Sequence, residues 1–129
     1  MIAYDLDGTL LTTHDAYWEG ISDKEANEIR MKQQLKYSPR HKFIIVTARS
    51  FRVADVTLQQ LVRHGLDKKC RKVEMVGYDG DVAEKKIAAC LKHGVKLLVE
   101  DNQNTIDRIN ADGRIKAVHI DSFLQKKAK

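Results

Sequence analysis

Acidic side chains follow two separate apolar segments of this chain. Asp5 and Asp7 stand in Tyr-Asp-Leu-Asp-Gly-Thr, and Glu100 and Asp101 stand in Leu-Val-Glu-Asp-Asn. Carboxylates packed within a few ångströms repel one another unless one takes up a proton or all of them share a cation. Oxygen ligands with no His or Cys nearby suit a hard ion, of which Mg²⁺ is the natural choice. We therefore expect the four acids to form a magnesium site.

Mg²⁺ in proteins usually binds one or two carboxylates together with phosphate oxygens of a substrate, so a phosphate monoester is the expected substrate. Asp5 would be the nucleophile and would carry an aspartyl-phosphate, which splits hydrolysis into two easier steps. Asp7 would act as general acid to the leaving oxygen and as general base to the attacking water. Gly8 permits the tight turn that points Asp7 the same way as Asp5. A plainer interpretation of both aspartates is a turn at the end of a strand.

Polar groups near the same sheet edge are expected to bind the transferred phosphoryl group. Thr47 follows a second apolar segment, in Ile-Val-Thr-Ala-Arg. Its hydroxyl and the backbone N–H groups of Gly8 and Thr9 would donate hydrogen bonds to phosphoryl oxygens. Ala48, the next residue along, is predicted to line the substrate site. Taken alone, Thr47 would be interpreted as a helix cap.

Cationic side chains accompany these groups. Lys85 and Lys86 stand in one predicted helix. One of them would neutralise the negative charge of the site that Mg²⁺ does not balance. Lys86 is preferred because it places residues at i+4 and i+5 toward the core, but Lys85 stays open. Arg49 is predicted to contact the substrate. For Arg49 and Arg52 two interpretations stand: they guide a phosphate backbone, or they are ordinary surface charges.

The elements that must position these residues alternate along the chain. Apolar segments with β-branched residues predict strands at 1–4, 42–47, 73–77, 95–99 and 115–120. Ser22 with Glu25, and Asp81 with Glu84, have the spacing of helix caps. Helices are expected from Ser22 to before Pro39, from Val53 to Gly65, from Asp81 to Gly94, and from Thr105 to Gly113. This alternation predicts an α/β fold: one Rossmann-like three-layer domain with a parallel five-stranded sheet and helices on both faces.

Composition limits the class of protein. The 129 residues are enough for one domain, which we expect over 1–124, with a flexible basic tail at 125–129. Lys and Arg number 23 against 18 Asp and Glu, and the net charge of +5 favours an acidic partner. No apolar segment approaches the roughly 20 residues of a membrane helix, and the start does not resemble a secretory signal. Cys70 and Cys90 are expected to be packing residues in a cytoplasmic protein.

Four motifs together resemble the haloacid dehalogenase superfamily, the phosphohydrolases with an aspartate nucleophile. Asp5-Leu-Asp-Gly-Thr-Leu-Leu is similar to its first motif and Phe43-Ile-Ile-Val-Thr-Ala-Arg to its second. Lys85 or Lys86 resembles the third motif, and Leu98-Val-Glu-Asp-Asn the fourth. The resemblance implies a sheet order of 5-4-1-2-3. It also implies Mg²⁺ bound by Asp5, by the backbone carbonyl of Asp7 and by the acidic pair.

The acidic pair departs from the family pattern. The usual pair is Asp-Asp, whereas this chain has Glu100-Asp101, which lengthens one carboxylate by a methylene. We expect Asp101 to touch the metal more directly, and Glu100 to act through water or through the lysine.

The lengths between the motifs indicate a protein without the cap domain of this superfamily. An open site would admit a bulky substrate, so a nucleic-acid terminus or a nucleotide is preferred. Tyr17-Trp18 and Glu-Asp-Asn resemble, more weakly, the phosphatase domains of polynucleotide kinase-phosphatases and RNA-repair proteins; the two aromatic residues would stack on a base or anchor a flap. Alternatives are a small-metabolite phosphatase closed by oligomerisation, a phosphotransferase, and a non-catalytic phosphate- or RNA-binding module. The oligomeric state does not follow from the sequence.

Overall fold

Five parallel strands form the centre of the molecule. The computed structural model describes residues 1–13 and 19–127. In spatial order the sheet runs β3-β2-β1-β4-β5, which is the predicted order 5-4-1-2-3 counted from the other edge. The strands are β1 (Ile2–Tyr4), β2 (Phe43–Thr47), β3 (Cys70–Met75), β4 (Leu97–Glu100) and β5 (Lys116–His119).

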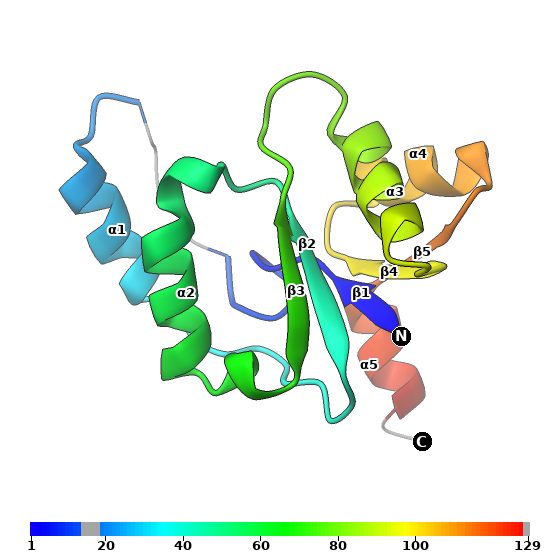
Figure 1. Ribbon diagram of the computed structural model, residues 1–129, viewed down its shortest axis with the longest axis horizontal. Coiled ribbons are helices and arrows are strands. Elements are labelled where there is room, and N and C mark those ends of the chain that lie inside the picture. The colour runs from blue at the N-terminus through cyan, green and yellow to red at the C-terminus, as the bar shows by residue number, and fades with distance from the viewer. Residues whose placement is uncertain (14–18, 128–129) are drawn as a thin grey trace.

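Helices cover both faces of this twisted sheet, as Figure 1 shows. Helices α3 and α4 share one core with the sheet, and α2 and α5 share the other. Two 3₁₀ turns, η1 (Phe51–Val53) and η2 (Leu66–Lys68), flank α2. The three-layer α/β arrangement is therefore confirmed. The α-helices are α1 (Asp23–Met31), α2 (Ala54–Arg63), α3 (Val82–Lys92), α4 (Gln103–Asp112) and α5 (Ile120–Lys127).

Strand β2 shows how the sheet is buried on both sides. Ile44 and Val46 belong to the core under α3 and α4, whereas Phe43 and Ile45 belong to the core under α2 and α5. Successive side chains of a strand point to opposite faces, so an unbroken apolar strand requires cover on both. Phe43, Ile44, Ile45 and Val46 are each at most 2% exposed.

The two predicted helix caps are confirmed. Ser22 Oγ accepts a hydrogen bond from the Glu25 N–H at 3.2 Å, at the start of α1. Asp81 Oδ1 accepts one from the Glu84 N–H at 3.1 Å, at the start of α3. Each cap satisfies a backbone donor that the first helical turn leaves without a partner.

The largest differences from the predicted element boundaries lie at the end of α1 and at the start of β3. Helix α1 ends at Met31, and Leu35 lies beyond it, bridged to Leu11. Strand β3 begins at Cys70 rather than at residue 73, because the edge strand continues its pairing with β2 through residues that are partly exposed.

Residues 125–127, which the sequence assigns to a basic tail, form the exposed end of α5. Ile120, Phe123 and Leu124 follow helical spacing and pack into the core that contains Tyr4 and Tyr37. The Phe123 ring lies 5.9 Å from the Tyr4 ring and 6.0 Å from the Tyr37 ring. This apolar contact anchors the first part of α5 to the domain.

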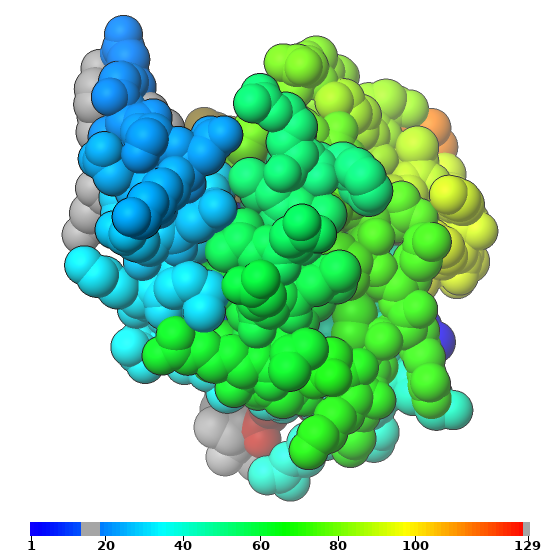
Figure 2. Space-filling view, turned by 60° about the vertical axis from the view of Figure 1, so that its left-hand side comes forward, coloured from blue at the N-terminus to red at the C-terminus, as the bar shows by residue number. Residues whose placement is uncertain are grey.

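Within the described residues, the segment between β1 and β2 contributes a single helix, α1, which lies beside α2 (Figure 2). Gln60 and Arg63 of α2 donate hydrogen bonds to the carbonyl oxygens of Arg30 and Met31. Tyr17 and Trp18, predicted to stack on a base or to anchor a flap, lie outside the described residues. No helix of the described part has the length and apolar character needed to cross a membrane.

Candidate active site

A cavity of about 300 Å³ opens at the carboxyl end of the sheet. Ligands of open parallel sheets bind at this end. Seven residues predicted from the sequence line it: Asp5, Asp7, Thr47, Ala48, Lys86, Glu100 and Asp101. Four lining residues were not predicted to belong to the site: Tyr78, Val82, Asn102 and Thr105.

Asp5 lies at the centre of this cavity wall, directly after β1. Its backbone N–H donates to the Val99 carbonyl at 2.9 Å, which continues the pairing with β4. Its carboxylate is buried, and Oδ1 lies 3.3 Å from Lys86 Nζ. Burial, partly offset by Lys86, and the nearby charge of Glu100 raise the pKa of Asp5 well above its usual value. An ionised Asp5 therefore needs more positive charge than Lys86 supplies.

Glu100 and Lys86 form a buried ion pair at 2.6 Å. Glu100 Oε1 also accepts the backbone N–H groups of Asp101 at 3.0 Å and Asn102 at 3.4 Å. Burial alone would raise the pKa of Glu100, but Lys86 and the hydrogen bonds outweigh burial and lower it to about 2. Burial likewise opposes the charge on Lys86, and its two acidic neighbours raise its pKa nevertheless. Glu100 thus contacts Lys86 directly, which is one of the two arrangements expected for its longer side chain.

Asp101 lies against the backbone of Gly8. Gly8 has a φ of +80°, and a Cβ there would overlap the Asp101 carboxylate. Glycine is therefore required both for the backbone conformation and for the close approach of this acid. Burial and the neighbouring Glu100 raise the pKa of Asp101 to about 6.

The acids of this cavity suit a divalent cation. Asp5, Glu100 and Asp101 each offer a carboxylate oxygen, and these atoms lie within 4.8 Å of one another. Three carboxylates face one buried ammonium group, so the cluster has a charge deficit that a hard cation would fill. The Asp7 carboxylate is not part of this group, because it turns toward Arg49.

Arg49 holds Asp7 through two hydrogen bonds. Its Nη2 donates to Asp7 Oδ1 at 2.7 Å and its Nε to Asp7 Oδ2 at 3.0 Å. Gln33 Nε2 adds a third hydrogen bond to Oδ1, at 2.8 Å. A planar guanidinium bound at both carboxylate oxygens fixes their orientation.

Both sequence interpretations of Arg49 are wrong. Its side chain is 1% exposed, so it is not a surface charge. The remaining donors of the guanidinium bind Thr57 Oγ1 at 3.0 Å, Gln60 Oε1 at 2.7 Å and Gln33 Oε1 at 3.0 Å. A guanidinium has five N–H donors, and all five are used inside the protein, which leaves none for a substrate phosphate.

The two lysines go to different places. Lys86 Nζ lies in the cavity at the carboxyl end of the sheet, 3.3 Å from Asp5 Oδ1, whereas Lys85 Nζ donates to the Val76 carbonyl at 2.8 Å in the loop after β3. Helix α3 buries the face that carries Ala83, Lys86 and Cys90. Lys86 therefore occupies the position that the sequence left open between the two.

The predicted phosphoryl donors are only partly available. Thr47 and Ala48 line the cavity. Thr9 does not fit its predicted role, because its backbone N–H donates to the Leu6 carbonyl at 3.2 Å and the residue is fully buried. The Thr9 hydroxyl is buried without a hydrogen-bond partner among the described residues.

Two kinds of site residue were missed. Tyr78 follows the apolar segment that ends at Gly77, so the rule that ligands bind where parallel strands end could have found it. Asn102 follows Asp101 and caps α4 by accepting the Thr105 N–H at 3.0 Å. Gln33, by contrast, carried no pattern that distinguishes it from a surface glutamine.

Comparison with known families agrees with this geometry. The family model described as haloacid dehalogenase-like hydrolase matches residues 2–112, from β1 to the end of α4. The matched range contains Asp5, Thr47, Lys86 and Asp101, which the fold brings to one cavity. Neither a curated protein nor a solved structure matches the chain. The chain belongs to the haloacid dehalogenase-like hydrolases.

Proposed function

We propose that this protein is a Mg²⁺-dependent phosphatase that hydrolyses a phosphate monoester through an aspartyl-phosphate on Asp5. The observation that carries the proposal is the charge deficit of the catalytic cavity, where Asp5, Glu100 and Asp101 face Lys86 alone. Buried carboxylates in excess are costly unless a cation and its ligand complete the cluster. A divalent cation satisfies that requirement, and its remaining coordination positions would take phosphoryl oxygens of the substrate.

Asp5 and Asp7 carry the two chemical steps of this proposed reaction. Asp7 enters the first step protonated. A carboxylate oxygen of Asp5 attacks phosphorus, the bond from phosphorus to the leaving oxygen breaks, and Asp7 gives that oxygen its proton, which leaves Asp7 as the carboxylate that Arg49 and Gln33 hold. Water then attacks the phosphorus of the aspartyl-phosphate and gives a proton to Asp7. Inorganic phosphate leaves and Asp5 is restored. Bound Mg²⁺, held by Asp5, Asp101 and the Asp7 carbonyl, would supply charge neutralisation for the phosphoryl oxygens.

Residues around the reacting pair position it. Arg49 and Gln33 orient the carboxylate of Asp7. Lys86 neutralises charge next to Asp5. The Thr47 hydroxyl lines the cavity at the end of β2 and is placed to donate to a phosphoryl oxygen.

The preferred substrate in this proposal is a nucleic-acid terminus or a nucleotide. Two observations support the preference. The net charge is +5, and between β1 and β2 the described residues add only the short helix α1 beside the site. A small neutral leaving group would use neither feature.

The proposal is tested by hydrolysis of 4-nitrophenyl phosphate with and without MgCl₂. Wild-type protein is expected to hydrolyse this ester only with the metal, and Asp5→Asn to lose at least about 10³-fold in kcat, because the amide cannot form the intermediate. Asp107→Asn makes the same change on the exposed surface of α4 and should keep the wild-type rate. Equal rates for wild type and Asp5→Asn would reject the mechanism.

A quench experiment examines the intermediate itself. Protein mixed with substrate and acidified within milliseconds should carry one phosphoryl group on the peptide that contains Asp5, as measured by mass spectrometry. Product analysis in the presence of alcohols separates hydrolysis from phosphotransfer. Phosphate on a different residue would contradict the assignment of Asp5.

A further inference from the structure

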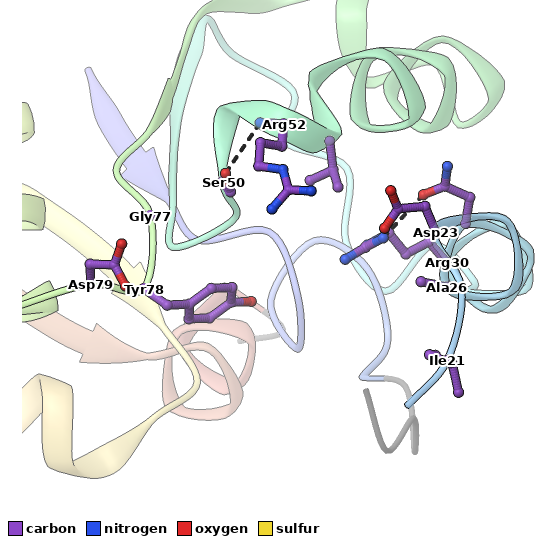
Figure 3. Close-up of a pocket in the computed structure, with 11 residues that line it drawn as sticks. Ile21, Asp23, Ala26, Arg30, Ser50, Arg52, Gly77, Tyr78 and Asp79 are labelled. Atoms are coloured by element: carbon purple, nitrogen blue, oxygen red, sulfur yellow. Dashed lines mark hydrogen bonds between the residues drawn. The ribbon is translucent and has the colours of Figure 1, made fainter. Parts of the chain in front are cut away.

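A second cavity lies beside the catalytic one. Its volume is about 490 Å³, and Tyr78 lines both cavities. We call it the α1 groove, because Asp23 and Arg30 of α1 line one wall while Arg52 and Tyr78 line the others (Figure 3). A leaving group whose phosphate occupies the catalytic cavity would extend past Tyr78 into the α1 groove.

Arg52 provides the groove with a cation that pairs with no acid among the described residues. Its backbone is fixed by the cap of η1, where Ser50 Oγ accepts the Arg52 N–H at 3.2 Å. Figure 3 shows its side chain reaching into the groove. Among residues 1–13 and 19–127, the acids that pair with Lys, Arg or His all pair with groups other than Arg52. A guanidinium in a concave surface matches the geometry of a phosphate group.

Arg30 adds a second cation from the opposite wall. Its Nη1 donates to Asn27 Oδ1 at 3.1 Å, and its side chain extends toward the middle of the groove. Burial and then the charge of Arg49 lower the pKa of Arg30. The same guanidinium would therefore be stabilised by an anion in the groove.

Two acids also line the groove, and they do not neutralise Arg52. Asp23 raises the pKa of Arg30 and so acts on that arginine. Asp79 lies across Tyr78 from both arginines in Figure 3. The positive charge of Arg52 therefore stays without an acidic partner among the described residues, and it faces the centre of the groove.

Tyr78 supplies an aromatic face between the two cavities. It is 66% exposed although it carries a large ring. Burial and then the charges of Asp7 and Asp5 raise the pKa of its hydroxyl, so the residue is close to the catalytic acids. Exposed aromatic rings stack on nucleobases at about 1–3 kcal/mol per base.

We propose that the α1 groove binds a second phosphate of the substrate on Arg52 and Arg30 and stacks the base on Tyr78. The substrate class is then a nucleotide with a phosphate next to the one that is cleaved, as in a nucleoside bisphosphate or a phosphorylated oligonucleotide end. This inference rests on the proposed function, which identifies the cleaved group as a phosphate monoester bound in the catalytic cavity. It assigns specificity to residues that the reaction itself does not use.

The test compares substrates on one enzyme. Adenosine 3′,5′-bisphosphate, both adenosine monophosphates, a sugar bisphosphate and 4-nitrophenyl phosphate are measured with wild type, Arg52→Ala and Arg71→Ala. For wild type, kcat/KM for the adenosine bisphosphate should exceed that for either monophosphate at least tenfold. Arg52→Ala should lower the ratio of kcat/KM for the bisphosphate to that for 4-nitrophenyl phosphate at least tenfold, through KM. Arg71→Ala removes an exposed arginine from β3, outside both cavities, and should keep the wild-type ratio.

Tyr78 variants separate the ring from the charges. Tyr78→Ala should raise KM for the adenosine bisphosphate about fivefold, leave KM for the sugar bisphosphate within twofold, and be rescued by Tyr78→Phe. Equal preference for the sugar and the adenosine bisphosphates would overturn the stacking role. An unchanged substrate ratio in Arg52→Ala would overturn the phosphate role.

Failure of the inference and failure of the proposed function give different results. If 4-nitrophenyl phosphate is cleaved but the ratio does not depend on Arg52, the phosphatase stands and the groove assignment falls. If no ester is cleaved, the phosphatase falls, and calorimetric titration with adenosine 3′,5′-bisphosphate still decides the groove. Binding that weakens at least tenfold in Arg52→Ala supports it, and binding that is absent or independent of Arg52 overturns it.

Discussion

Two buried charged clusters lie side by side at the carboxyl end of the sheet, and they are opposite in character. Around Arg49, one cation is surrounded by Asp7 and three neutral side chains, and every guanidinium donor has an acceptor. Around Lys86, one cation is shared by Asp5 and Glu100, with Asp101 next to them. The first cluster is saturated and positions a side chain. The second lacks positive charge, and this deficit indicates where a ligand binds.

The largest expected effect is on the saturated cluster. Arg49→Met removes the counter-charge of Asp7 and leaves buried amide and hydroxyl groups without donors. Breaking a buried ion pair in this way costs about 3–5 kcal/mol, so the free energy of unfolding should fall by that amount in urea titrations. Arg71→Met, on the exposed face of β3, should change it by no more than about 0.5 kcal/mol. A loss below about 1 kcal/mol for Arg49→Met would mean that the cluster is not a structural unit.

The deficient cluster should respond to metal instead. At a MgCl₂ concentration of about 100 times Kd, the free energy of unfolding of the wild type should rise by about 2.7 kcal/mol. Asp101→Asn should lose most of that increase, because one oxygen ligand becomes a neutral amide. Thermal denaturation with MgCl₂ and with EDTA measures this stabilisation for the wild type and for Asp101→Asn. Equal stabilisation of the two proteins would show that Mg²⁺ binds elsewhere.

Removing a charge from the deficient cluster should stabilise the metal-free protein. Asp5→Asn relieves the repulsion that raises the pKa of Asp5. At pH 8 in EDTA the variant should have a higher free energy of unfolding than the wild type, while it loses catalysis. Asp107→Asn, on the surface of α4, is the matched control and should be near neutral. A less stable Asp5→Asn would indicate that Lys86 already balances the acids.

The smallest effect is a pH dependence. The pKa of Asp101 is raised to about 6 in the folded protein, against about 3.9 in an unfolded chain. An acid with a raised folded pKa stabilises the fold below its unfolded pKa, and that contribution is lost as the pH rises through 6. In EDTA, the difference in stability between Asp101→Asn and wild type should therefore grow by about 1 kcal/mol from pH 4 to pH 7, after allowance for partial exposure. A difference in stability that does not change between pH 4 and pH 7 would contradict the raised pKa of Asp101.

The deficient cluster could be predicted from the sequence because each of its acids follows a strand. The positions of Asp5, Glu100 and Asp101 depend on strand ends alone, and strand ends follow from apolar segments that the printed sequence shows. The preference for Lys86 was also sound, because Ala83 and Cys90 mark the buried face of α3 on which it lies.

The saturated cluster could not be predicted in the same way. Arg49 meets Gln33 and Gln60 only because α1 and α2 pack together, and no local pattern records that contact. Helix α5 was missed for a different reason. The apolar spacing of Ile120, Phe123 and Leu124 was present in the sequence, but the predicted strand over 115–120 ended at the residue where this helix begins.

Pairing on both edges of β1 has a consequence for changes in chain length. Tyr4 is opposite Ile45 of β2 and Val99 of β4, so Asp5 can shift only in whole residues. Deleting one residue before Asp5 would bring Leu6, which is fully buried, to the position that Asp5 now has. Each side chain that shifts by one residue in the strand would then point to the opposite face of the sheet. Substitutions in this strand are thus graded in effect, whereas a single insertion or deletion would be all-or-none.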